Sequence, residues 1–276
     1  MSTSGSSRPA DIYTHGHHSS VLRSHSARTA QNSAGYLVPH LHAGDRVLDV
    51  GCGPGSITLD FAELVAPGKV IGLEQSQTAV AAAREAAAAA ESKASFVVGD
   101  VYALEFADSS FDVVHAHQVL QHLSDPSAAL REMSRVCRPG GIVAVRDADY
   151  SAMSWYPASV GLSEWMDLYQ RVARANAAEP DGGRHLLAWA HAAGLHDITP
   201  SASVWCYATA EDRTEWGQTW AVRVTQSEFA RQALAAGFAI QADLDRLAAA
   251  WRDWAADPDG WFTISHGELI CTVPSA

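Results

Sequence analysis

Residues 46–55 read Arg-Val-Leu-Asp-Val-Gly-Cys-Gly-Pro-Gly, and this run sets the architecture of the chain. Its first half is apolar apart from Arg46 and Asp49, which is typical of a β-strand covered on both faces. Its second half places three glycines at a strand-to-helix turn, where a ligand can approach the backbone closely. Pro54 suits the start of a helix, and the free N–H groups there favour a phosphate or a carboxylate. The run therefore predicts a ligand-binding turn without naming the ligand.

The spacing of the glycines excludes some ligands. A dinucleotide fingerprint requires G-x-G-x-x-G, whereas here the third glycine comes one position early and Ser56 occupies its expected place. The spacing therefore disfavours an NAD-dependent oxidoreductase. A P-loop is excluded because no Lys-Ser/Thr pair follows the glycines.

Helical and strand patterns alternate downstream of this turn. Such a succession of strands and helices implies a mostly parallel α/β sheet. The expected elements are a strand at 46–50, a helix at 55–66, a strand at 69–74, a helix at 77–91, strands at 95–100 and 111–117, a helix at 127–137 and a strand at 141–147.

Acidic residues close the second and third strands. Glu74 can accept both ribose hydroxyls of an adenosine-type ligand that lies across the strand ends. Asp100, in Gly99-Asp100-Val101, can accept from an adenine amino group. Together with the glycine turn they predict one nucleoside slot in the crevice where open α/β sheets bind ligands.

Several motifs together resemble class I S-adenosylmethionine-dependent methyltransferases of the ubiquinone/menaquinone-biosynthesis type. The resemblance covers roughly residues 30–150 and, more narrowly, is to a subgroup that acts on small-molecule secondary metabolites. It implies a Rossmann-like, seven-stranded, mostly parallel sheet with a helical cap inserted between the last two strands. The motifs are LDVGCGPG, Glu74, the Gly-Asp pair at 99–100, FDVVHAHQVLQHL at 111–123 and RPGG at 138–141; YTHGHHSSVLRSHSARTAQNSAGYL, HAHQVL and DYSAMSWYP carry the narrower match.

The resemblance also implies which residues contact the cofactor, S-adenosyl-L-methionine. In such enzymes the glycine turn meets the methionine half, the end of the second strand meets the ribose, the end of the third meets the adenine, and the end of the fourth lines the sulfonium. The corresponding residues are Asp49, Gly51, Cys52, Gly53 and Gly55; Glu74 and Gln75; Gly99, Asp100 and Val101; and His117 and Gln118. We interpret Cys52 as a small packed side chain and not as a nucleophile.

Methyl transfer needs little chemistry from the protein. The sulfonium methyl is already electrophilic, so the protein aligns the acceptor and excludes water. A hydroxyl acceptor needs a base, and a thiol needs less help. His117 and His18 are the candidate catalytic groups, although the ring of His117 could simply pack between strand and helix. We expect His122 to make a local hydrogen bond or cap.

The chain divides into three expected parts. Residues 1–30 are expected to form a polar, disordered tail and an N-terminal lid, in which Tyr13, Arg23 and Arg28 could cover the cofactor or pair with its carboxylate. Four lid histidines lack a cysteine or carboxylate at ligand spacing, so no metal site is expected; they are His15, His17, His18 and His25. Residues 31–150 form the cofactor-binding core, and residues 151–276 form a substrate cap with the last strands.

All nine tryptophans lie in that third part. Their helical spacing predicts two amphipathic helices over residues 211–257, flanked by strands at 205–209 and 262–273. Tryptophans spaced in this way pack the cap's own core or bind a flat acceptor, and we expect some to serve each purpose.

Composition limits the partners of this 276-residue chain. Its 31 acidic and 19 basic residues give a net charge of -12 without a basic patch, which argues against nucleic-acid and membrane partners and favours an uncharged or cationic acceptor. Four widely spaced cysteines and the lack of an apolar leader or span indicate a cytoplasmic protein. The sequence does not set the oligomeric state.

The predicted reaction is methyl transfer from S-adenosylmethionine to O, S, N or C of a small organic molecule. The alternative is a protein that binds this cofactor without transferring the methyl group: a partner subunit, a sensor or a non-methylating enzyme. Binding without product formation would distinguish it.

Overall fold

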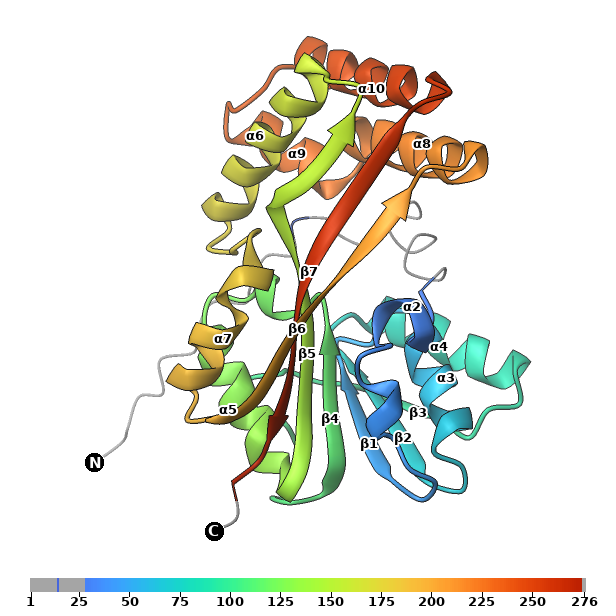
Figure 1. The fold of residues 1–276 in the computed structure, drawn as a ribbon, viewed down its shortest axis with the longest axis vertical. Helices are drawn as coiled ribbons and strands as arrows, with labels where there is room; N and C mark the ends of the chain where they lie inside the picture. Colours follow the sequence, from blue (N-terminus) through green and yellow to red (C-terminus); the bar gives the residue numbers. More distant parts are fainter. Residues whose placement is uncertain (1–13, 15–27, 275–276) are drawn as a thin grey trace.

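The computed structural model describes residue 14 and residues 28–274 and contains one seven-stranded sheet (Figure 1). The strand order is β3-β2-β1-β4-β5-β7-β6. Strands β1 to β5 are parallel to one another, whereas β7 runs antiparallel to both β5 and β6, so the expected Rossmann-like, mostly parallel α/β fold is confirmed. The strands are β1 (Arg46–Val50), β2 (Lys69–Glu74), β3 (Ser95–Val98), β4 (Phe111–His117), β5 (Cys137–Tyr156), β6 (Asp197–Tyr207) and β7 (Trp261–Thr272).

Helices cover both faces of the sheet because its central strands are apolar on both sides. Val47 and Leu48 of β1 are fully buried, one against each helical layer. Helices α2 (Ala30–Ser33), α3 (Ser56–Leu64) and α4 (Gln77–Ala89) cover one face, and α5 (Pro126–Val136) and α7 (Gly182–Ala192) cover the other (Figure 1). Short 3₁₀ turns η1 (Val38–His40) and η2 (Leu120–His122) complete the core.

Strands β5, β6 and β7 extend beyond the rest of the sheet (Figure 1). β5 continues nine residues past its expected end at Asp147, and β6 begins eight residues before the expected start at Trp205. Residues 197–204 lack an apolar alternation because β6 is an edge strand whose serines face Glu268 of β7. Pro200 is tolerated there because an edge strand leaves one row of N–H groups unpaired.

The cap contains more helices than the sequence pattern predicts. Three helices, not two, occupy residues 210–256: α8 (Ala210–Gln226), α9 (Glu228–Ala235) and α10 (Gln241–Ala256). Ser227 has extended backbone that separates α8 from α9. These helices lie between β6 and β7, which confirms the expected insertion, and α6 (Val160–Ala175) packs with them. None of the described helices is long and apolar enough to span a bilayer.

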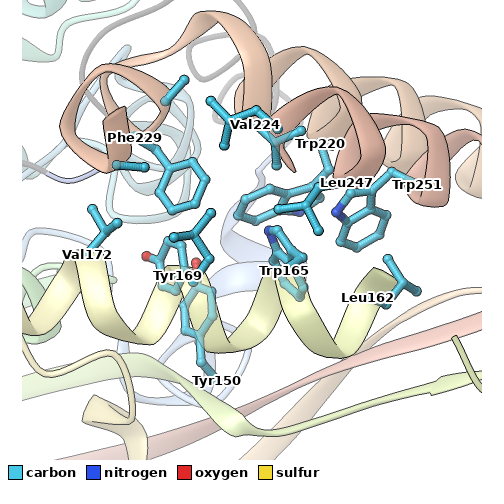
Figure 2. Close-up of a cluster of buried hydrophobic side chains, with 14 of the residues drawn as sticks. Tyr150, Leu162, Trp165, Tyr169, Val172, Trp220, Val224, Phe229, Leu247 and Trp251 are labelled. Atoms are coloured by element: carbon cyan, nitrogen blue, oxygen red, sulfur yellow. The ribbon is translucent and has the colours of Figure 1, made fainter. Parts of the chain in front are cut away.

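Aromatic rings form the core of the cap (Figure 2). The ring of Trp165 meets those of Trp220 and Trp251 edge to face, at centroid distances of 4.5 and 4.8 Å. Tyr150 of β5 stacks on Tyr169 of α6 at 4.0 Å, so the sheet extension is part of the same core. The expectation that tryptophans build the cap's own core is confirmed for these three.

Truncating the central ring should loosen the cap. We expect Trp165→Ala to lower the free energy of unfolding by about 3–5 kcal/mol, because it leaves a cavity between fully buried rings. Trp261→Ala is the matched control, since that ring is 40% exposed, and should cost about 1 kcal/mol or less. Denaturant titration followed by circular dichroism measures both; equal losses would show that the ring cluster does not hold the cap.

Candidate functional site

The turn after β1 needs its glycines. Gly51, Gly53 and Gly55 have φ angles of +67°, +53° and +86°, in the left-handed region that side chains disfavour. A β-carbon on Gly51 would lie 2.4 Å from a methyl carbon of Val119. One on Gly55 would lie 2.7 Å from a ring carbon of Phe96. The turn therefore presents bare backbone at the N-terminus of α3.

Asp49 lies beneath this turn with both carboxylate oxygens engaged. Oδ1 is 2.8 Å from Nδ1 of His115, and Oδ2 accepts from the Thr58 hydroxyl at 2.6 Å. The carboxylate thereby joins β1, β4 and α3, and it is only 2% exposed. Its side chain supports the turn from inside, and direct contact between Asp49 and a cofactor stays a prediction. Sequence reasoning missed His115. It lies two residues before His117 on β4, so the sequence already indicates that both side chains are on the same face of the sheet.

Glu74 reaches from the end of β2 across the glycine turn. Its Oε2 accepts from the Gly53 N–H at 3.2 Å, and its Oε1 accepts from the Ser76 N–H at 2.9 Å. The neighbouring strand brings Gly99 alongside, since the Gly99 N–H donates to the Glu74 carbonyl at 3.2 Å. The structure thus brings together the predicted turn and the predicted second and third strand ends.

The remaining predicted cofactor-binding residues at the ends of β2 and β3 differ in exposure. Asp100 is exposed, and its Oδ1 accepts from the Tyr102 N–H at 2.9 Å. Gln75 is exposed, whereas Val101 is buried. Burial, followed by the charges of Asp49 and Glu74, raises the pKa of the Cys52 thiol well above its usual range. A thiol kept protonated in this way is a poor nucleophile, which supports the interpretation of Cys52 as a packing residue.

Gln118 directly follows β4, the next strand whose end was predicted to contact the cofactor, and its φ is +53°. Its Oε1 accepts from the Arg28 guanidinium at 2.7 Å, so its Nε2 is the donor toward Nε2 of His266, 2.8 Å away. His266 therefore accepts through Nε2 and is neutral. Burial, with the charges of Arg146 and Arg28, lowers the pKa of His266 well below its usual value.

His117 is buried beside Gln118. Neither of its ring nitrogens has a hydrogen-bond partner among the described residues. Its ring centroid lies 5.6 Å from that of Trp205. Burial, followed by the charges of Arg28 and Arg146, lowers the pKa of His117 well below its usual value, so its ring is neutral. The candidate His18 lies outside the described residues, as do the other lid positions His15, His17, His25, Tyr13 and Arg23.

His122 is the last residue of the short 3₁₀ helix η2. Its Nε2 is 3.1 Å from the Gln121 amide nitrogen, and burial lowers its pKa to about 3. This local contact agrees with the interpretation of His122 as a structural residue. Among the described residues, no group of three or more potential ligands could hold a metal ion.

A cavity of about 390 Å³ opens beside Gln118. Its walls come from the N-terminal segment, the extensions of β5, β6 and β7, and helix α8. Five aromatic residues and four charged residues line it: Tyr150, Trp205, Tyr207, Trp216 and Trp220, with Arg28, Arg223, Asp212 and Glu215. Sequence reasoning missed Arg223, although it follows Trp216 and Trp220 along one face of a helix.

The cavity and the glycine turn are adjacent. Gln118 lines the cavity, while the next residue, Val119, packs directly against Gly51. The bare turn, the Glu74 carboxylate and the Gln118 amide therefore form one continuous row that ends at the cavity. Such a row fits an elongated ligand with a carboxylate at the helix N-terminus and hydroxyls at Glu74.

Comparison with known proteins agrees with this arrangement. The family model described as a methyltransferase domain matches residues 41–219. The chain is 37% identical to an uncharacterized methyltransferase of Schizosaccharomyces pombe, over 96% of this chain and 98% of that one. It is 28% identical to a probable methyltransferase of Aspergillus luteorubrus, over 94% and 96%. The solved YcgJ structure from Bacillus subtilis shares the fold, with a TM-score of 0.56 and 18% identity over 89% of this chain and 100% of that one.

One buried carboxyl group lies on β5, next to the segment that follows Gln118. Asp147 of β5 is fully buried; its Oδ1 accepts from the Gln121 N–H at 3.1 Å, and its Oδ2 has no hydrogen-bond partner among the described residues. Burial raises the pKa of this carboxyl to about 8. Asp147 is therefore largely protonated at neutral pH.

This pKa predicts how stability depends on pH. In the unfolded chain Asp147 ionises near pH 4, whereas in the folded protein it holds its proton up to about pH 8. The contribution of this group to the free energy of unfolding of the wild type therefore decreases as the pH rises from about 4 to about 8. Asn cannot ionise. The melting temperature of Asp147→Asn, relative to wild type, should therefore rise from pH 5 to pH 8 and level off above. Exposed Asp259→Asn is the control; a flat difference for Asp147→Asn would contradict the assignment.

Proposed function

The chain belongs to the S-adenosylmethionine-dependent methyltransferases, and we propose that it methylates an O, S, N or C atom of a small organic molecule held in the cavity beside Gln118. One observation carries this proposal: Gln118 lines the cavity while its neighbour Val119 packs on the glycine turn. S-adenosylmethionine bound along the strand ends would thus have its sulfonium end next to the cavity, where an acceptor can lie. The resemblance of residues 149–157 to enzymes of secondary metabolism supports a secondary metabolite as the acceptor.

The cofactor contacts follow the row of strand ends. The methionine carboxylate is assigned to the first turn of α3, because the N–H groups of Gly51, Cys52, Gly53 and Gly55 already donate within the protein. Each Glu74 oxygen accepts one backbone N–H and keeps a lone pair for a ribose hydroxyl. The full proposed set is Asp49, Gly51, Cys52, Gly53 and Gly55 for the methionine half, Glu74 and Gln75 for the ribose, Gly99, Asp100 and Val101 for the adenine, and His117 and Gln118 at the sulfonium end.

The cofactor supplies an electrophilic methyl group, and the chain's residues align the acceptor and keep water away. The Gln118 amide is fixed between Arg28 and His266, so it presents a rigid edge to the cavity. His117 is neutral and has a lone pair, but its lowered pKa makes it a weak base and it does not line the cavity. As the candidate base it therefore suits an acceptor that loses its proton readily, such as a thiol.

The parts of the chain have separate tasks in this proposal. Residues 31–150 bind the cofactor, and residues 151–276 select the acceptor through the cavity walls. Residues 1–30 are assigned to a tail and a lid; Arg28, which belongs to the described part of this segment, lines the cavity and contacts Gln118.

Removing either acidic strand end should weaken cofactor binding. We expect Glu74→Ala and Asp100→Ala each to weaken S-adenosylhomocysteine binding by about 1–3 kcal/mol, because hydrogen bonds to the ribose and adenine are lost. Isothermal titration calorimetry measures the change, with exposed Glu85→Ala on α4 as the control. Unchanged affinity in both variants would refute the slot.

Isotope labelling tests transfer itself. Extracts of the producing cell, incubated with the enzyme and an equal mixture of ordinary and methyl-deuterated S-adenosylmethionine, should yield a product that appears in mass spectra as a doublet. The doublet spacing is that between a CH₃ and a CD₃ group. Cofactor binding without any such doublet would favour a partner subunit, a sensor or a non-methylating enzyme over a methyltransferase.

A further inference from the structure

Asp49 and His115 face each other across two neighbouring strands of the sheet. They are direct partners in the parallel register of β1 with β4, so both side chains point to the same face. Oδ1 of Asp49 is 2.8 Å from Nδ1 of His115, and both residues are buried, at 2% and 0% exposure. Asp49 comes two residues before Gly51, so the pair lies next to the glycine turn.

The second hydrogen bond of Asp49 shows how its carboxylate is held. Oδ2 accepts from the Thr58 hydroxyl at 2.6 Å. Because a carboxylate offers only lone pairs, we assign Nδ1 of His115 as the donor to Oδ1. Each carboxylate oxygen thus has one donor, and the two donors come from different elements, β4 and α3.

His115 makes no other hydrogen bond among the described residues. Its Nε2 has no partner there, and its ring lies edge to face with that of Phe61, at a centroid distance of 5.0 Å. Two residues earlier, on the same face of β4, the apolar side chain of Val113 is packed in the same layer. A buried imidazole is less favourable there than an apolar side chain unless it is hydrogen-bonded, so the contact with Asp49 is what His115 contributes.

The N-terminus of α3 is held by the same carboxylate. The residue before the helix is Gly55, which has no side chain that could accept from the first turn. Thr58 is the third residue of α3 and is fully buried, and its hydroxyl is tied to Asp49. Burial, followed by the charge of Asp49, raises the pKa of the Cys52 thiol, so the carboxylate acts on the glycine turn as well. Asp49 therefore links β4 to both backbone segments of the proposed methionine site.

We propose that His115 is a positioning residue of the cofactor site. By donating to Asp49, it holds the glycine turn and the first turn of α3 in the place where the methionine half of S-adenosylmethionine binds. His115 acts through Asp49 and Thr58 and not by touching the cofactor. This inference rests on the proposed function, which assigns the methionine carboxylate to the first turn of α3.

Loss of the His115 donor changes what Asp49 does. Its Oδ1 would be buried without a partner, which is unfavourable for a carboxylate oxygen. The first turn of a helix attracts carboxylates through its N–H groups and its dipole, so Asp49 should shift toward the N-terminus of α3. There it would compete with the carboxylate of the cofactor, and binding of the methionine half should weaken.

Two ligands separate the methionine half from the rest of the cofactor. S-adenosylhomocysteine carries the amino-acid group, whereas 5′-methylthioadenosine keeps the adenosine and the sulfur but lacks that group. Isothermal titration calorimetry on the full chain gives both dissociation constants, with the weaker ligand measured by competition against the stronger. The ratio of the two constants reports the contribution of the methionine half. A substitution that only destabilises the fold weakens both ligands alike or neither.

Three substitutions test the two donors of Asp49. His115→Leu removes the donor on β4 and keeps a side chain of similar size; it should weaken S-adenosylhomocysteine binding about tenfold and leave 5′-methylthioadenosine within about twofold. His115→Asn places an amide nitrogen where Nδ1 lies, and should restore S-adenosylhomocysteine binding to within about threefold of wild type. Thr58→Val removes the donor on α3 and should act as His115→Leu does.

Val113→Ala is the matched control. Val113 is buried on the same face of β4, but it lies opposite Val47 and not opposite Asp49. The substitution should lower the melting temperature and leave both dissociation constants unchanged. Thermal melting checks that every variant folds, and Thr58→Val decides if His115→Leu does not.

The outcomes separate this inference from the proposed function. An unchanged ratio in His115→Leu, including equal weakening of both ligands, would overturn the inference, as would a folded His115→Asn that does not restore binding. If the wild type binds both ligands and the ratio does not respond to the substitutions, only this inference fails. If the wild type binds neither ligand, the proposed function fails and this inference fails with it.

Discussion

The long antiparallel pairing of β5 with β7 is the constraint on which the rest of the site depends. It runs from Ile142 opposite Thr272 in the core to Tyr156 opposite Trp261 in the cap, with a shift in register between Asp149 and Ser154. The same two strands therefore belong to the sheet and to the aromatic core of the cap. Because the cap is built on these strands, its cavity opens at the edge of the sheet where the parallel strands end.

Buried polar groups fix the cavity wall from behind. Arg146 of β5 pairs with Glu268 of β7 at 3.0 Å, and its guanidinium carbon lies 4.8 Å from the ring centroid of Trp205. The indole N–H of Trp205 donates to the Asn32 carbonyl at 2.6 Å. A buried ion pair adds little net stability, yet leaving one partner alone is costly, so such a pair specifies an arrangement. Here it specifies the position of an aromatic ring that lines the cavity.

Local patterns predicted the strands whose ends form the row, and nonlocal packing accounts for what they missed. The strands at 46–50, 69–74 and 111–117 have the predicted bounds, because each is a short apolar run between turn residues. The extension of β5 could not be predicted, since it exists only through pairing with β7. Likewise, the third helix in the cap depends on the extended backbone of Ser227. Arg223 gave a helical-spacing signal, but its place in the cavity depends on how α8 packs on the sheet.

Hydrogen–deuterium exchange with and without S-adenosylhomocysteine tests the central claim most directly, because it reports where the ligand contacts the backbone. The account predicts slower exchange in the peptides that contain the ends of β1, β2, β3 and β4, with Gly53, Glu74, Asp100 and Gln118. Peptides from the surface of α10 should not change. Protection that avoids these four strand ends, or a ligand that changes no peptide, would contradict the account.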